Sequence, residues 1–75
     1  MSRSNEYRVW DSMVRRCHNP SHHAFKDYGA RGITVCEKWR TFAGFFEDMG
    51  NQPHGLSIER IDNSLGYFKE NCKWA

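Results

Sequence analysis

The sequence predicts a small α+β domain, in which two helices pack on a short antiparallel β-hairpin. Three observations predict this class. Two stretches carry apolar residues spaced three and four apart, as amphipathic helices do. Short β-type segments joined by a polar turn make up the C-terminal region. The 75 residues contain no repeat, low-complexity tract or linker, so residues 1–75 are expected to form a single domain.

The first helix is expected over residues 5–17. Ser4 precedes it and is a residue type preferred at an N-cap, whereas the segment 19–21 (Asn-Pro-Ser) ends the helical pattern. The polar, histidine-rich stretch that follows, up to Lys26, is expected to be a loop. The buried face of the helix is expected to consist of the apolar residues Tyr7, Trp10, Met13, Val14 and Cys17.

The middle of the chain predicts a strand and then a second helix. Residues 33–36 (Ile-Thr-Val-Cys) are expected to form a short strand after a glycine-containing turn. The helix is expected over residues 37–49, with Gly50 as its C-cap. Gly44 inside this helix costs about 1 kcal/mol relative to Ala, so a close neighbour is expected there. The buried stripe is expected to hold Trp39, Phe42, Ala43, Phe46 and Met49, widened by Phe45.

The C-terminal region is expected to form the hairpin. The first strand is predicted within residues 56–61, the turn over residues 63–66, and the second strand in a segment that ends at Trp74. Ile61 and Trp74 are expected to complete the core, while the charged face of the hairpin is exposed to solvent.

The composition limits the class of protein. Five Phe, three Trp and three Tyr can supply a core, but a domain of this size usually needs a further stabilising element, such as a metal, a disulfide or a partner. The net charge of +2 permits contact with nucleic acid without requiring it. No apolar run is as long as a membrane span, and residues 1–5 carry no signal-peptide pattern. A cytoplasmic protein without a membrane partner is therefore expected.

The three cysteines allow two interpretations. Their odd number excludes a fully paired internal disulfide framework, and no CxxC pair marks a zinc site. Cys17, Cys36 and Cys72 lie at the ends of one expected helix, one expected strand and the final segment, so they can converge on zinc with His18, His22 or His23 as the fourth ligand. The alternative is that each cysteine is a small buried apolar residue.

Two stretches carry a resemblance to a known family. They are residues 26–39 (KDYGARGITVCEKW) and the pair of segments 59–63 (ERIDN) and 70–75 (ENCKWA). This arrangement resembles the small HNH-like proteins, or ββα-metal fingers, of bacteriophages and mobile elements. The resemblance implies a fold that is HNH-like, and the sequence given stops at Ala75, where the terminal helix of the finger would begin. It also implies the cytoplasm of a host bacterium as the location, if a phage encodes the chain.

The resemblance assigns roles to three residues. It places Glu59 at the first metal-ligand position, Arg60 at the general-base position and Asn71 at the central Asn that fixes the loop. Arginine stays protonated at any working pH and cannot be a general base, but it can bind a phosphate. Asp62 can join Glu59 as a carboxylate ligand of Mg²⁺. A structural salt bridge between Glu59 and Arg60 is the alternative to a phosphate or metal role.

Three functions follow from these observations. The favoured one is a non-catalytic module that binds nucleic acid, with Arg31, Arg60 and Lys73 facing one side and following a phosphate backbone. The second is a phage counter-defence protein, an inhibitor of the anti-CRISPR kind, that binds a host protein or ribonucleoprotein complex. The third is a metal-dependent DNA endonuclease with unusual residues. The basic residues are interleaved with acidic ones, so an ordinary mixed surface is also consistent with the sequence.

Overall fold

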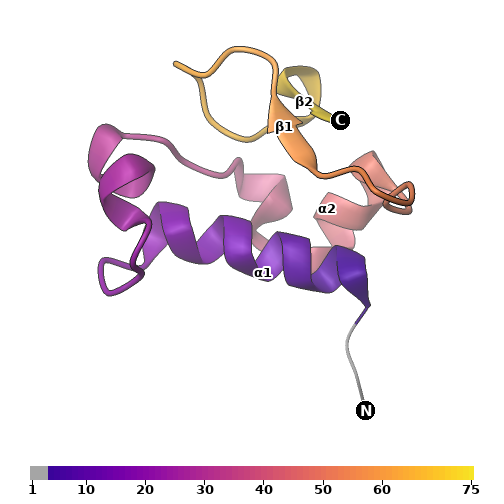
Figure 1. Cartoon of the computed structure of the whole chain (residues 1–75), viewed down its shortest axis with the longest axis horizontal. Coiled ribbons are helices and arrows are strands. Elements are labelled where there is room, and N and C mark those ends of the chain that lie inside the picture. The colour runs from indigo at the N-terminus through magenta and orange to yellow at the C-terminus, as the bar shows by residue number, and fades with distance from the viewer. Residues whose placement is uncertain (1–3) are drawn as a thin grey trace.

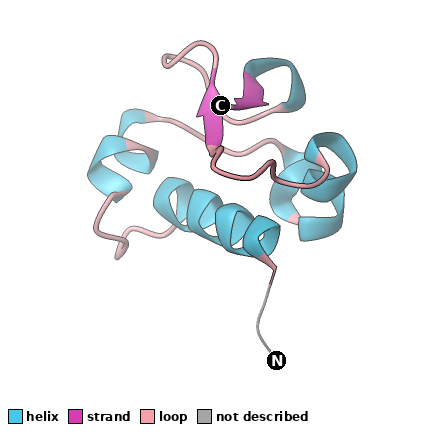
Figure 2. Cartoon of the chain, turned by 45° about the vertical axis from the view of Figure 1, so that its right-hand side comes forward, coloured by secondary structure: helices cyan, strands magenta, loops and turns pink. Residues whose placement is uncertain are grey.

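The computed structural model describes residues 4–75 and has the α+β class that the sequence predicts. Two α-helices, α1 (Asn5–His18) and α2 (Phe42–Met49), pack with a hairpin of β1 (Ile58–Arg60) and β2 (Cys72–Trp74). Figure 1 shows α1 along one side of the molecule, with the hairpin on the other side and α2 behind. Short 3₁₀ turns connect these elements, and Figure 2 shows how much of the chain is helical or loop. They are η1 (Phe25–Asp27), η2 (Gly29–Arg31), η3 (Glu37–Arg40) and η4 (Lys69–Asn71).

Helix α1 confirms its predicted N-cap and extends one residue beyond its predicted end. The Ser4 hydroxyl accepts the backbone N–H of Tyr7 at 3.1 Å, which satisfies one of the free donors of the first turn. At the other end, the N–H of Asn19 donates to the Arg15 carbonyl at 2.8 Å. Met13 and Cys17 are buried, so α1 presents the expected apolar face to the core.

The single helix expected over residues 37–49 is wrong, because the chain breaks at Thr41. Thr41 has an extended backbone, and its hydroxyl accepts the N–H of Gly44 at 3.2 Å as the N-cap of α2. After the break, Phe45 is fully buried, whereas Phe46, which was expected in the buried stripe, is 37% exposed. The close neighbour expected at Gly44 is present, because a Cβ added there would meet the Lys38 carbonyl.

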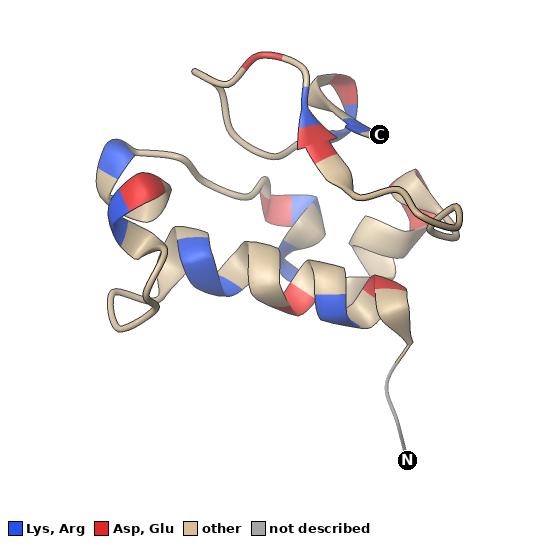
Figure 3. Cartoon of the chain, viewed as in Figure 1, with Lys and Arg blue, Asp and Glu red and all other residues tan. Residues whose placement is uncertain are grey.

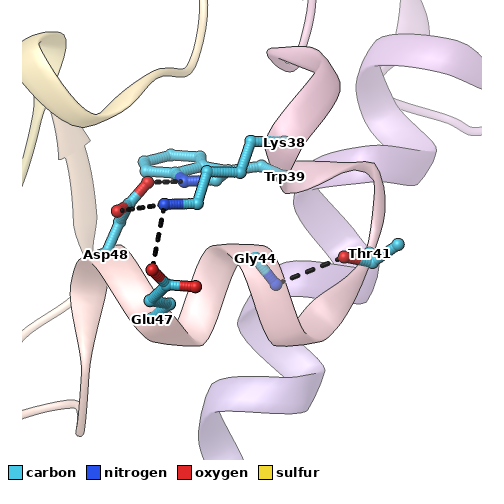
Figure 4. A network of polar contacts seen from close by, with 6 residues as sticks. All are labelled: Lys38, Trp39, Thr41, Gly44, Glu47 and Asp48. Atoms are coloured by element: carbon cyan, nitrogen blue, oxygen red, sulfur yellow. Dashed lines mark hydrogen bonds and ion pairs between the residues drawn. The ribbon is translucent and has the colours of Figure 1, made fainter.

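A polar network joins η3 to α2 across this break (Figure 4). The carboxylate of Asp48 accepts the indole N–H of the fully buried Trp39 at 2.8 Å and the Lys38 ammonium at 2.9 Å. These two bonds, that of Lys38 foremost, lower the pKa of Asp48. Lys38 also lies 3.5 Å from Glu47. The network therefore supplies the partner that a buried indole N–H requires.

The strand expected over residues 33–36 is reduced to one bridge. Val35 pairs in parallel with Tyr67, whose N–H and C=O bond to Thr34 and Cys36 at 2.8 and 2.9 Å. The alternation of apolar and polar residues is preserved, since Ile33 and Val35 are buried and Thr34 is exposed. Among residues 4–75 this segment forms a single bridge, so it is extended without forming a ladder.

The hairpin pairs β1 with β2 in an antiparallel register that sets Glu59 opposite Lys73 and Arg60 opposite Cys72. The backbones of Ser57 and Ala75 exchange two hydrogen bonds of 2.8 Å and extend the pairing. Trp74 joins the core as predicted and donates its indole N–H to the Met49 carbonyl at 2.8 Å.

The expectation for Ile61 is wrong, because its side chain is 62% exposed just after β1. The chain has left the ladder at that point, so the alternation of faces no longer directs Ile61 inward. Among residues 4–75, no helix is long and apolar enough to cross a bilayer.

Candidate functional site: the hairpin loop and its basic surroundings

The loop between β1 and β2 is held from inside by Asn71. Its side chain is buried, donates from Nδ2 to the carbonyls of Asp62 and Gly66 at 3.1 and 2.9 Å, and accepts the Asp62 N–H at 2.9 Å. Its backbone carbonyl also accepts the N–H of Ile61 at 2.7 Å. A single carboxamide thus uses both its donor and its acceptor to tie the end of the loop at Asn71 to its start at Asp62 and its middle at Gly66.

Arg60 fixes the same loop with a charged group. Its Nη1 donates to the carbonyls of Asn63 and Leu65, both at 2.8 Å. The guanidinium carbon lies 5.4 Å from the centre of the Tyr28 ring and 5.3 Å from that of Tyr67, within the range of cation–π contacts. Through these contacts the Arg60 side chain stabilises the loop, and it does so as a hydrogen-bond donor.

The acidic residues of the loop do not pair with Arg60. Residues 4–75 contain no Glu59–Arg60 ion pair within 4.0 Å, because the two adjacent side chains take opposite faces of β1 and that of Glu59 is exposed. The salt bridge proposed from the sequence is therefore wrong. Asp62 accepts the N–H and hydroxyl of Ser64 at 2.9 and 2.6 Å, and these bonds lower the pKa of its carboxyl.

The described residues contain no group of three or more His, Cys, Asp or Glu side chains arranged to hold a metal. The zinc set of Cys17, Cys36, Cys72 and His18 is not assembled, and neither is a larger group around Glu59 and Asp62. The Nε2 atom of His18 accepts the N–H of Val35 at 3.2 Å and so already has a partner. Burial raises the pKa of the thiols of Cys17 and Cys72, to about 11 for Cys72.

The basic side chains named from the sequence occupy different environments. Arg31 is exposed and donates from Nη1 to the Asp27 carbonyl at 3.2 Å, whereas Lys73 is exposed on β2. Figure 3 shows basic positions along α1, at η1 and η2 and on the hairpin. Of the basic residues in the described part of the chain, only Arg15 and Lys38 form ion pairs within 4.0 Å. Six exposed side chains have no acidic partner in this range, namely Arg8, Lys26, Arg31, Arg40, Lys69 and Lys73.

Sequence reasoning missed a cluster formed by Arg16, Arg60, Tyr28 and Tyr67, called here the arginine–tyrosine cluster. Arg16 donates from Nη2 to the Tyr67 hydroxyl at 2.6 Å, and its guanidinium carbon lies 4.7 Å from the Tyr28 ring centre. The two tyrosine rings stack at 6.5 Å. The four residues come from four separate segments, so no spacing in the sequence links them.

Comparisons of the chain with protein-family models, with curated proteins and with solved structures found no match.

Proposed function

We propose that this chain is an HNH-like module that binds nucleic acid and does not cut it. The proposal assigns two tasks to different residues. Arg60 and Asn71 hold the hairpin loop in shape, and exposed basic side chains that include Arg31 and Lys73 bind the phosphate backbone.

The observation that carries the proposal is the set of exposed cations without acidic partners. The set comprises Arg8, Lys26, Arg31, Arg40, Lys69 and Lys73, which come from α1, η1, η2, η3, η4 and β2. No acidic side chain within residues 4–75 lies within 4.0 Å of their charged groups. A cation without an internal partner loses little when it binds a phosphate, and it releases counterions from the nucleic acid. The net charge of +2 is compatible with the same kind of partner.

Arg60 supports binding without cleavage. In the resemblance to HNH proteins it stands where the general base would be, and its Nη1 donates to two carbonyls. A guanidinium has no lone pair to accept a proton from water.

The test is a binding titration with a fluorescently labelled DNA duplex, repeated with single-stranded DNA and RNA, between about 50 and 200 mM salt. We expect an affinity that falls steeply with salt, and no nicking of plasmid DNA in the presence of Mg²⁺, Mn²⁺ or Zn²⁺. Absence of binding to every nucleic acid would reject the proposal. Nicking that disappears in Glu59→Ala would instead establish a nuclease.

A protein partner is the second candidate, and the apolar residues of the loop favour it. Ile61 and Leu65 are 62% and 46% exposed, although Asn71 and Arg60 hold the backbone around them. Exposed apolar side chains on a fixed loop are suited to a protein interface. A host protein or ribonucleoprotein complex captured by the wild type and lost in an Ile61→Asp, Leu65→Asp double variant, without salt-dependent binding of nucleic acid, would support this function.

A further inference from the structure

A groove of about 420 Å³ lies between α1 and the start of β1. Its size is within the range of about 300–1,000 Å³ that is common for sites binding small molecules or parts of larger ligands. Figure 1 shows the two elements that border it, with α1 running horizontally and β1 above it. The groove is lined by Arg8, Val9, Ser12, Arg16, Ser57 and Ile58.

The groove combines positive charge with hydroxyl groups. Arg8, Ser12 and Arg16 follow one another at intervals of four residues, so they lie on one face of α1 with the serine between the two arginines. Ser57 contributes a second hydroxyl from the opposite wall, while Val9 and Ile58 supply apolar surface. No acidic side chain lines the groove. Two guanidiniums and two hydroxyls are donors suited to the oxygens of a phosphate group.

Arg16 also carries a positive charge that no acidic side chain within residues 4–75 neutralises. Its guanidinium and that of Arg60 lie 4.7 and 5.4 Å from the centre of the same Tyr28 ring. Neither arginine has an acidic partner within 4.0 Å among residues 4–75. The Nε–H of Arg16 is covered from solvent and has no acceptor in this part of the chain. Two like charges near one ring repel each other, and an anion beside Arg16 relieves that repulsion.

Arg16 is positioned before any ligand arrives. Its bond to the Tyr67 hydroxyl and its contacts with the two tyrosine rings fix the guanidinium at one end of the groove. Arg8 is exposed at the other end and has no acidic partner to release. A site that is already ordered loses less conformational entropy on binding than a site made only of flexible lysines.

We propose that this groove binds one phosphodiester of a nucleic-acid strand, with the phosphate between Arg8 and Arg16 and the adjoining sugar against Val9 and Ile58. This inference rests on the proposed function and deepens it, because it names the place where the backbone is bound. The basic residues elsewhere then add non-specific attraction around a single fixed contact.

The experiment compares substitutions inside the groove with matched substitutions outside it. Arg8→Ala removes one charge from the groove, and Arg15→Ala removes one charge from the same helix at an exposed residue paired with Asp11. Ser12→Glu places a carboxylate between the arginines, and Ser21→Glu makes the same charge change at an exposed turn. Circular dichroism checks that each variant is folded. Arg8 is exposed on a helix, where alanine is well tolerated.

Binding to a labelled oligonucleotide is then measured by fluorescence anisotropy. We expect Arg8→Ala to weaken binding about tenfold and to reduce the slope of log K against log salt by about one, with a larger loss for Ser12→Glu. Arg15→Ala and Ser21→Glu should change the affinity less than about threefold. If groove and control variants lose the same affinity, the groove proposal is wrong, while nucleic-acid binding stands.

Amide chemical shifts followed by NMR identify the source of the phosphate. Titration of the wild type with the oligonucleotide should move the amide signals of Ser12, Arg16 and Ser57, and inorganic phosphate at the same phosphorus concentration should move them less. If inorganic phosphate causes the stronger shifts and the oligonucleotide does not bind, the ligand of the groove is a free phosphate and not a nucleic acid. That result would also overturn the proposed function. No shift at these amides with either probe would reject the groove as an anion site.

Discussion

The carboxamide Nδ2 of Asn71 lies 2.9 Å from the carbonyl oxygen of Gly66 and donates a hydrogen bond that ties the end of the hairpin loop to its middle. Replacement of Asn71 by Asp puts an acceptor where this donor stands and faces it with the carbonyls of Gly66 and Asp62. We expect Asn71→Asp to lower the free energy of unfolding by about 2–3 kcal/mol, because buried acceptors lose their partner and a charge is desolvated. Urea denaturation followed by tryptophan fluorescence measures this change.

The control for Asn71 is a residue of the same type in the same loop. Asn63 is exposed and contributes its backbone carbonyl, not its side chain, to the bond with Arg60. Asn63→Asp should therefore change the unfolding free energy by less than about 0.5 kcal/mol. Equal losses in the two variants would mean that the effect comes from added negative charge rather than from the buried carboxamide.

We expect Arg60 to contribute to the stability of the fold more than to the binding of nucleic acid. Arg60→Lys keeps the positive charge but removes the planar group that reaches the Asn63 and Leu65 carbonyls and lies over the tyrosine rings. We expect a loss of about 1–3 kcal/mol in the free energy of unfolding, since these are charge-assisted bonds. The salt slope of nucleic-acid binding should stay unchanged. Glu59→Gln on the outer face of β1 is the control and should leave stability nearly unaltered.

Substitution of Gly44 by alanine distinguishes helix propensity from packing, because the two effects change the free energy of unfolding in opposite directions. Propensity alone predicts that Gly44→Ala stabilises α2 by about 1 kcal/mol. A Cβ at this position would meet the backbone carbonyl of Lys38, which cannot move without disturbing the network around Asp48. We therefore expect Gly44→Ala to destabilise the protein by about 1–3 kcal/mol in thermal or urea denaturation. A stabilised variant would show that the contact between η3 and α2 is easily relaxed.

Ala43 is the matched control for Gly44. It is the neighbouring residue in α2 and is exposed. Ala43→Gly should cost about 1 kcal/mol through helix propensity alone. The two reciprocal substitutions are thus expected to destabilise the protein for different reasons.

His18 should make stability depend on pH in the acidic range. Burial and, to a smaller extent, the nearby Arg40 lower its pKa below the ordinary value of 6.5, and its Nε2 accepts the Val35 N–H in the neutral form. Above the unfolded pKa, near 6.5, the stabilising effect is fully present. As pH falls towards the folded pKa, the unfolded chain binds more protons than the native one, so the unfolding free energy decreases.

Chemical denaturation at a series of pH values between about 7 and 5 tests this expectation. In His18→Gln the decrease in unfolding free energy should be smaller, because glutamine does not titrate and its carbonyl can still accept a hydrogen bond. His22→Asn tests the second histidine whose pKa is lowered, chiefly by burial, and it should remove a separate part of the decrease. If His18→Gln keeps the full pH dependence, His18 is not its source.

The fold could be predicted from the sequence where one local signal decided the structure. Ser4 caps α1 as predicted. Met13 and Cys17, which belong to the predicted apolar stripe of α1, are buried. The helix expected over residues 37–49 failed because its apolar spacing continues through Thr41, a β-branched residue with a hydroxyl that can cap a new helix. The strand expected at 33–36 is not formed because pairing depends on the neighbouring segment, and within residues 4–75 that segment makes only the bridge between Val35 and Tyr67.

The candidate site was less predictable, for a physical reason. Asn71 was identified because a resemblance supplied its role, and its contacts with Asp62 and Gly66 match that role. The cluster of Arg16 with Tyr28 and Tyr67 joins residues up to 51 positions apart in the sequence. The identities of these amino acids do not predict that they are in contact. The interval of four that places Arg8, Ser12 and Arg16 on one face was readable in the sequence, but only the approach of Ser57 and Ile58 turns that face into a groove.

The three thiols should differ in reactivity as their burial differs. Cys17 and Cys72 are 4% and 8% exposed, while Cys36 is only half-buried. The pKa of Cys72 is raised to about 11, chiefly by burial, so almost none of it is thiolate near neutral pH. We expect iodoacetamide to alkylate Cys36 first in the native protein and to reach Cys17 and Cys72 only after unfolding in guanidinium chloride, as mapped by mass spectrometry. The Cys36→Ser variant should lose the fast phase, whereas rapid native labelling of Cys72 would show that β2 opens frequently.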